Sequence, residues 1–280
     1  MKPEILRTIA ALREHVAVWR REAASVGMTP TMGALHEGHL ALVREAQRRS
    51  DRIIVTLFVN PAQFAPTEDL GAYPRTEDED RRKLAQLGAD VLFVPAAEEM
   101  YPSGFDTEVL VGGPSRGLET DFRPHFFSGV ATIVAKLLLA GMPDRAFFGE
   151  KDYQQLLVVK KLARDLNIPT EIVGCPTVRE ADGLAMSSRN AFLSPGERQR
   201  APELHATLRE AALRLRHGDD AATILAQGRR ALATSGFAVD YIEFRNAETL
   251  APVDDWSEEP IRILAAARLG ATRLIDNIAV

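Results

Sequence analysis

Residues 26–39 read VGMTPTMGALHEGH: a short apolar run, a glycine-containing turn, and the start of a helical pattern that continues to residue 49. A short strand that passes through a tight turn into a helix is the opening unit of an open α/β sheet. Gly33 suits the turn because it lacks a Cβ that could clash. In such sheets, ligands bind beyond the carboxyl ends of the strands, where helix N-termini point.

The same alternation of strands and helices continues on the C-terminal side of this unit. Residues 52–59 (RIIVTLFV) are β-branched and almost continuously apolar, which is typical of a strand buried on both faces. Further strands are predicted over residues 89–94, 145–148 and 170–173, and helices over residues 78–87, 129–140 and 152–166. The pattern predicts a Rossmann-like α/β domain with a doubly wound parallel sheet.

The pattern changes after Pro176. Helices rich in Ala, Arg and Leu are predicted over residues 197–217 and 220–233, followed by strands over residues 239–244, 261–267 and 272–276. Residues 251–260 are acidic and are expected to form a surface connection. We therefore expect two domains, residues 1–175 and a smaller α+β C-terminal lid domain over residues 176–280.

The composition argues against a disulfide-linked, nucleic-acid-binding or membrane-spanning protein. The chain has 280 residues, a formal net charge of −5 and one cysteine, Cys175, so no intrachain disulfide can form. An acidic chain is a poor candidate for wholesale binding to nucleic acid or anionic membranes. The N-terminus reads as an amphipathic helix without a signal peptide's apolar region, and no apolar run approaches the ~20 residues of a membrane span. We expect a cytoplasmic protein.

His36 and His39 open the first helix and share one face of it. The N–H groups at a helix N-terminus favour phosphate, and two imidazoles there can donate hydrogen bonds to its oxygens. Gly38 between them is expected to leave room for a bulky anion. An isolated HxxH pair is more often two surface histidines. A zinc site is disfavoured because the spacing and glutamate of HExxH are missing.

Three further segments carry polar groups suited to a nucleotide and a small acid. Residues 148–155 (FGEKDYQQ) and 58–64 (FVNPAQF) each follow a predicted strand, and residues 186–190 (MSSRN) follow a turn. Lys151 can neutralise a phosphate, and Arg189 can grip one through two hydrogen bonds. Taken singly, each segment can also be explained by a helix cap, a turn or a solvated loop.

HxGH after a first strand, with a later Ser-Ser-Arg loop, resembles the HIGH/KMSKS superfamily of nucleotidyltransferases and class I aminoacyl-tRNA synthetases. The longer strings PTMGALHEGH, FVNPAQF, YPRT, FFGEKDYQQL, PTVREADGLAMSSRN and AARLGATRLIDN resemble the pantoate–β-alanine ligase family. They span residues 30–277 in order. The resemblance implies a Rossmann-like domain, a smaller domain that closes over ATP, a homodimer, Mg²⁺ accompanying ATP and no tightly bound cofactor.

The resemblance also implies roles for individual residues. The implied ATP-binding residues are Met32, Gly33, Ala34, Leu35, His36, Glu37, Gly38, His39, Gly149, Glu150, Lys151, Asp152, Val178 (through its backbone), Met186, Ser187, Ser188 and Arg189. Gln63 and Gln155 are expected to hold pantoate, with Gln63 also near β-alanine. The catalytic groups are expected to be His36, His39, Lys151 and Arg189, with His39 as the proton donor. No metal ligand is predicted from the protein, although the acidic run 77–80 could hold Mg²⁺ through water or form a solvated helix face.

One departure stands out. The family pattern reads RPxHFxGV, whereas residues 123–130 here read RPHFFSGV, so His125 comes one place early and Phe126 takes the histidine's position. The reaction implied is attack of the pantoate carboxylate on the α-phosphorus of ATP, followed by attack of β-alanine on the pantoyl adenylate, with release of AMP. Alternatives are another HxGH adenylyltransferase, which would make a dinucleotide, and an inactive nucleotide-binding regulator.

Overall fold

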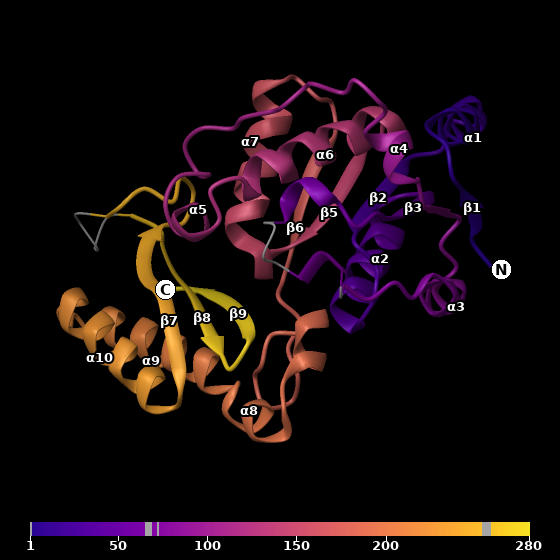
Figure 1. Cartoon of the computed structure of the whole chain (residues 1–280). Coiled ribbons are helices and arrows are strands. Elements are labelled where there is room, and N and C mark those ends of the chain that lie inside the picture. Colours follow the sequence, from indigo (N-terminus) through magenta and orange to yellow (C-terminus); the bar gives the residue numbers. More distant parts are fainter. Residues whose placement is uncertain (1, 65–68, 72, 254–258) are drawn as a thin grey trace.

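The computed structural model describes residues 2–64, 69–71, 73–253 and 259–280. It has two units, a larger one built on a parallel sheet and a smaller one built on an antiparallel sheet (Figure 1). The parallel sheet contains β1 (Glu4–Leu6), β2 (Val26–Thr31), β3 (Arg52–Leu57), β4 (Val91–Phe93), β5 (Arg145–Gly149) and β6 (Glu171–Cys175). The predicted fold class is confirmed.

The strand order positions the site. The order is β1-β4-β3-β2-β5-β6, so the chain winds outward from β2 through β3 to β4 and then returns to β5 on the other side of β2. The order therefore reverses between β2 and β5, and the loops after these two strands diverge. A crevice at such a reversal is where open α/β sheets bind ligands.

Helices cover both faces of this sheet. They are α1 (Ile9–Arg21), α2 (Glu37–Arg49), α3 (Glu77–Leu87), α6 (Phe126–Gly141) and α7 (Tyr153–Asp165), with short helices α4 (Ala97–Met100) and α5 (Glu119–Phe122). Alternate residues of β3 serve different faces: Ile54 packs with α1, α6 and α7, whereas Ile53 and Val55 pack with α2 and α3. Burial on both faces explains why the strand is apolar throughout.

The smaller unit contains helices α8 (Pro195–Arg200), α9 (Glu203–Arg216) and α10 (Ala221–Thr234) and strands β7 (Phe237–Asn246), β8 (Ile261–Leu269) and β9 (Thr272–Ala279). The strands pair antiparallel in the order β7-β8-β9. On β8, Ile263 and Ala265 face the core shared with α9 and α10, whereas Leu264 and Ala266 pack with Leu118 and Leu157 of the larger unit. The antiparallel sheet is thus an apolar layer that joins the two units.

Two details differ from the sequence prediction, and a third is not tested. The helix predicted over residues 197–217 is broken between α8 and α9, because Pro202 has no N–H with which to continue the first helix. Strand β1 and the short helices α4 and α5 were not predicted; β1 is a three-residue strand that depends on parallel pairing with β4. The acidic connection predicted over residues 251–260 includes residues 254–258, which lie outside the described residues.

Candidate active site

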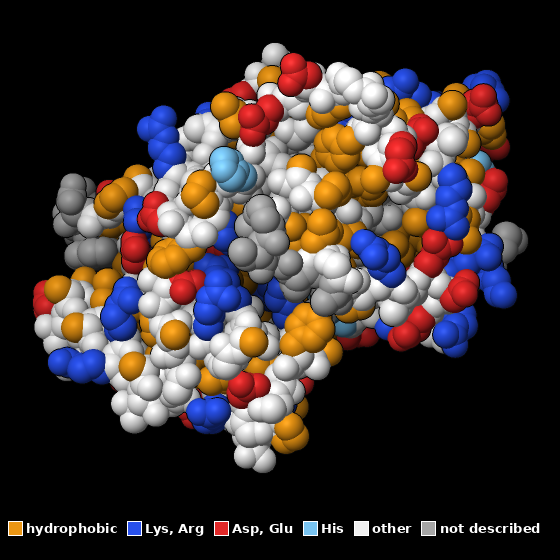
Figure 2. All heavy atoms as spheres, in the orientation of Figure 1, with side chains coloured by type: hydrophobic (Ala, Val, Ile, Leu, Met, Phe, Trp, Pro, Cys, Tyr) orange, Lys and Arg blue, Asp and Glu red, His pale blue; other side chains and the backbone are white. Residues whose placement is uncertain are grey.

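A cavity of about 760 Å³ lies at the sheet's reversal point and is lined by residues from both units. All four segments singled out from the sequence contribute to it, through His36, Gln63, Lys151 and Ser188 among others. The surface is hollowed where the two units meet, and Lys and Arg side chains lie along the hollow (Figure 2). The structure therefore brings most of the predicted site residues together in one place. The predicted ATP-binding residues that do not line this cavity are Gly33, Ala34, Leu35, Glu37 and Glu150.

The turn between β2 and α2 is held by a buried carboxylate on α3. Gly33 and Ala34 both have positive φ, 89° and 50°, so the turn needs support from outside. Asp80 accepts hydrogen bonds from the backbone N–H groups of Ala34 (2.9 Å) and Leu35 (2.8 Å), and it is fully buried. The sequence prediction that residues 77–80 form a solvated helix face or hold Mg²⁺ is therefore wrong for Asp80, because its oxygens bind this turn.

The two histidines are neutral, oriented hydrogen-bond donors. Nδ1 of His36 accepts from Gly38 N–H (3.2 Å), and Nδ1 of His39 accepts from His36 N–H (3.4 Å). Burial, with a smaller contribution from positive Lys151, lowers the pKa of His39 to about 3 and the pKa of His36 to about 4. A neutral imidazole that accepts at Nδ1 carries its proton on Nε2. Each ring therefore presents an Nε2–H on the edge opposite the helix backbone.

Gly38 lines the cavity, and it has a structural reason beside the predicted one. A Cβ at this position would lie 2.9 Å from Nδ1 and Cε1 of His36. The absent side chain makes room for the His36 ring in its capping position, so Gly38 acts by allowing one histidine to cap α2.

Gln63 is positioned by a buried amide. It lies at the end of η1 (Pro61–Gln63), and its side-chain oxygen accepts from Asn60 Nδ2 (3.1 Å). Asn60 also donates to the carbonyl of Gly129 (3.0 Å) and accepts from the hydroxyl of Tyr101 (2.7 Å). A Cβ on Gly129 would lie 2.3 Å from a carbonyl oxygen of η1, so only glycine lets α6 approach this closely.

The two adjacent glutamines on α7 both line the cavity but differ in what their side chains bind. Gln155 is half-buried and lines the cavity. Its neighbour Gln154 is buried and donates to the carbonyls of Pro114 (2.9 Å) and Gly117 (3.1 Å). Gln154 therefore holds a loop, and Gln155 is the amide available to a substrate.

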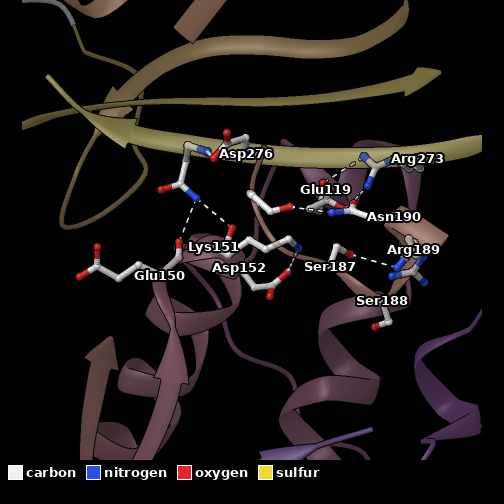
Figure 3. A network of polar contacts seen from close by, with 12 residues as sticks. Glu119, Glu150, Lys151, Asp152, Ser187, Ser188, Arg189, Asn190, Arg273 and Asp276 are labelled. Carbon is white, nitrogen blue, oxygen red and sulfur yellow. Dashed lines mark hydrogen bonds and ion pairs between the residues drawn. The ribbon is translucent and has the colours of Figure 1, made fainter. Parts of the chain in front are cut away.

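Lys151 lies in the 3₁₀ turn η3 (Glu150–Asp152), directly after β5. Its ammonium lies 3.4 Å from the carboxylate of Asp152, and its side chain extends toward the side of the cavity where Ser187 lies (Figure 3). Gly149 ends β5 and lines the cavity next to this turn. Glu150 instead points toward the smaller unit, where its carboxylate lies 3.2 Å from Arg262. Glu150 does not line the cavity, and its predicted contact with the nucleotide stays a prediction.

The serine–arginine segment follows a short hairpin. Met186 N–H donates to the carbonyl of Val178 (3.0 Å), which ties the predicted adenine-binding residue to the start of the segment. Ser187 caps η4 (Ser188–Phe192) by accepting from Arg189 N–H (3.3 Å), and Ser188 lies 3.4 Å from the hydroxyl of Tyr73. The caps fix the backbone so that residues 186–189 all line the cavity.

Phe126 forms part of the cavity wall next to Arg123. The Arg123 guanidinium lies 3.8 Å above the Phe126 ring, within the range of a cation–π contact. Arg123 also donates to the backbone carbonyl of Gln63 (3.2 Å). At the position where the family has histidine, this chain therefore has an aromatic support for a cavity arginine, and His125 precedes α6 without a side-chain cap.

Sequence reasoning missed several residues of the site. Glu119 is buried and accepts from Arg273 (2.7 and 2.9 Å) and from the hydroxyl of Tyr241 (2.8 Å), which links α5 to the smaller unit. Arg123 was also missed as a site residue, and Asp80 was named only as part of the acidic run 77–80. The only signal in the sequence was their presence inside or beside the quoted family strings, because their partners are distant along the chain.

The comparisons with known proteins agree with this geometry. The family model described as pantoate-beta-alanine ligase matches residues 4–279. The chain belongs to this family. Pantothenate synthetase from Bradyrhizobium sp. (strain BTAi1) is 56% identical, with 99% of each chain covered, and that from Mesorhizobium japonicum is 53% identical, with 99% of this chain and 98% of the relative covered.

Solved structures of the family also match. Pantothenate synthetase from Thermus thermophilus is 48% identical with a TM-score of 0.91, and 98% of each chain is covered. A pantoate-beta-alanine ligase from Francisella tularensis, complexed with beta-gamma ATP and beta-alanine, is 33% identical with a TM-score of 0.83, covering 99% of this chain and 97% of the other. The chain is an ATP-dependent ligase that joins pantoate to β-alanine. None of its described helices is both long and apolar enough to span a bilayer.

Proposed function

We propose that the ligase reaction runs through a pantoyl adenylate that forms and reacts in the cavity between the two units. A carboxylate does not acylate an amine, because its oxygen is a poor leaving group. Attack of a pantoate carboxylate oxygen on the α-phosphorus of ATP forms the mixed anhydride and expels pyrophosphate. The amine of β-alanine then attacks the acyl carbon, and AMP leaves with the electron pair of the broken C–O bond.

The observation that carries the proposal is the set of neutral imidazole donors opposite two cations. His36 and His39 line the cavity with Nδ1 bound by the helix backbone, which leaves Nε2–H for a ligand, while Lys151 and Arg189 line it from other elements. Such fixed donors stabilise the charge that develops on the phosphates without reorganising. His39 is the proposed proton donor, since its Nδ1 accepts from His36 N–H, which leaves the proton on Nε2, and burial keeps the ring uncharged.

The remaining predicted residues fit binding roles. The proposed phosphate contacts are the backbone of residues 32–39 and 149–152 and the side chains of Ser187, Ser188 and Arg189. Gln63 and Gln155 are proposed to bind pantoate, because both line the cavity. Val178 is proposed to bind adenine through its backbone.

Mg²⁺ is proposed to enter with the nucleotide. Glu119 and Asp276 already bind arginines, whereas the Asp152 side chain is 45% exposed beside Lys151. Asp152 is therefore the cavity carboxylate that could hold the ion through water, with the phosphates as its other ligands. The ion would neutralise phosphate charge.

We also propose a homodimer in the cytoplasm, and a division into residues 1–175 and a lid over residues 176–280. The family resemblance supports the homodimer. For the boundary, the support is that β6, the last strand of the parallel sheet, ends at Cys175. Closure of the second unit would protect the adenylate from water.

Pantoate-dependent exchange of pyrophosphate into ATP tests the adenylate. Exchange in the absence of β-alanine is expected, and AMP release should require both pantoate and β-alanine. His39→Ala should lower the exchange rate about 10²–10³-fold, the cost of one oxyanion-type donor. His217→Ala, at the exposed end of α9, is the matched control. Wild-type exchange by His39→Ala would remove the role given to His39, and no exchange by the unmodified enzyme would remove the adenylate.

A further inference from the structure

Asn277 on strand β9 of the smaller unit contacts η3, the turn that carries Lys151. The amide nitrogen of Asn277 donates to two consecutive backbone carbonyls of η3, those of Glu150 (2.9 Å) and Lys151 (2.9 Å). An asparagine amide has two N–H donors, so both are used on this turn. Asn277 is 4% exposed, which means that water does not compete for these bonds.

The preceding residue on the same strand holds the other phosphate-binding element. Asp276 is 3% exposed and makes a bidentate ion pair with Arg179, with N–O distances of 2.7 and 2.9 Å. Arg179 in turn donates to the carbonyl of Gly183 (3.1 Å), inside the hairpin that leads to residues 186–189. Successive side chains on a strand point to opposite sides, so two neighbouring residues can serve two different elements.

We propose that Asp276 and Asn277 are a pair of positioning residues that set the spacing between Lys151 and the Ser187–Ser188–Arg189 segment. Neither residue needs to touch the reacting atoms. Asn277 acts through the backbone that carries Lys151, and Asp276 acts through Arg179 and the hairpin. The inference rests on the roles proposed above for Lys151 and Arg189.

The chemistry of Asn277 provides a sharp perturbation. Asn277→Asp keeps the shape of the side chain but replaces both donors by a carboxylate that faces two carbonyl oxygens. The turn must then move to relieve the repulsion, and Lys151 moves with it. A displacement of about 1 Å at a reacting group can cost on the order of 10²-fold in rate. Asn277→Ser keeps one donor and is expected to cost less.

The experiment measures pantoate-dependent ATP–pyrophosphate exchange at saturating ATP. We expect Asn277→Asp to lower the rate about 10²-fold and Asn277→Ser about 10-fold. Asn167→Asp makes the same chemical change at an exposed position and is the matched control, expected to stay within about two-fold of wild type. Thermal unfolding of each variant accompanies the rates, and Asn277→Ser provides the rate if Asn277→Asp does not fold.

Double variants separate positioning from general support of the fold. If Asn277 acts through Lys151, then Asn277→Asp in a Lys151→Ala enzyme should cost only about two- to three-fold more, because the lysine it positions is gone. Asp276→Asn should likewise lose most of its effect in an Arg189→Ala enzyme. For each pair, the non-additive result supports the inference.

Three outcomes count against specific claims. Asn277→Asp and Asn277→Ser at the wild-type rate would overturn the inference, and so would a full 10²-fold loss added on top of Lys151→Ala. Lys151→Ala with wild-type exchange would instead overturn the role proposed for the lysine. The failure of the positioning pair is thereby distinguishable from the failure of the proposed mechanism.

Discussion

Acidification should destabilise the fold through the two active-site histidines before it protonates the carboxylates. Burial lowers the pKa of His39 to about 3 and of His36 to about 4, from 6.5 in the unfolded chain. Between these values the unfolded state binds more protons than the folded state, so the free energy of unfolding falls as the pH falls. Protonation of either Nδ1 would also break the hydrogen bond that it accepts from a backbone N–H group.

The size of the effect follows from these pKa values. Between pH 7 and pH 5, a histidine with an unfolded pKa of 6.5 and a folded pKa of 3 loses about 2 kcal/mol of stabilisation. The loss from His36 is smaller, about 1 kcal/mol, because solvent reaches part of its ring and screens the charge. Together they predict that the free energy of unfolding falls by about 3 kcal/mol between pH 7 and pH 5.

Urea denaturation at pH 7 and pH 5 measures this difference. The matched variant is His36→Asn with His39→Asn, because asparagine can place an oxygen where histidine places Nδ1, caps a helix well and does not titrate in this range. The double variant should lose about 3 kcal/mol less than wild type between the two pH values. His205, whose pKa is also lowered by burial, should account for part of the remaining slope. An equal loss in the variant and the wild type would refute the reasoning.

Further predictions concern the framework of the site. Gly129→Ala should destabilise the fold by about 1–3 kcal/mol, because its Cβ would lie 2.3 Å from a backbone oxygen. In the control variant Gly196→Ala, the Cβ meets nothing within 4 Å, and the stability should not change. Equal melting temperatures for the two variants would contradict this prediction. In Phe126→His, kcat/KM for pantoate should fall by roughly 3- to 10-fold relative to wild type between pH 8 and pH 6, because an imidazolium repels Arg123. Phe126→Tyr should show no such fall. A ratio of variant to wild-type kcat/KM that does not change with pH would show that the ring does not support the arginine. Asp80→Asn should lower the free energy of unfolding in urea by about 2–3 kcal/mol, because its NH₂ group would face backbone donors. It should also lower the rate of pyrophosphate exchange. An unchanged exchange rate would show that the turn holds without the carboxylate.

Much of the fold was predictable because its signals are local. The turn at Gly33, the buried run over residues 52–59 and the end of α3 at Gly88 (φ 76°) each depend on a few neighbouring residues. The break at Pro202 was also a local signal, and a continuous helical pattern around it obscured it. Strand β1 has only three residues, too few to show a period.

The site was predictable in its outline but not in its supports. His36, His39, Lys151 and the serine–arginine segment lie in recognisable strings, and the structure brings them to one cavity. Their chemical roles stay predictions. The contact of Gly38 with the His36 ring was not predictable, since it depends on the rotamer that the folded helix start imposes.

Residue order and spacing were enough to indicate a doubly wound sheet and the segments at its carboxyl edge, because hydrophobic period and turn chemistry act over a few residues. The partners of buried polar groups come from anywhere in the chain: Asp80 holds a turn 46 residues before it, and Asn277 holds one that lies 126 residues before it. The neutral state of the histidines also depends on burial by distant elements. Only the packed structure could reveal these contacts, since a hydrogen bond or a lowered pKa requires proximity in space and not in sequence.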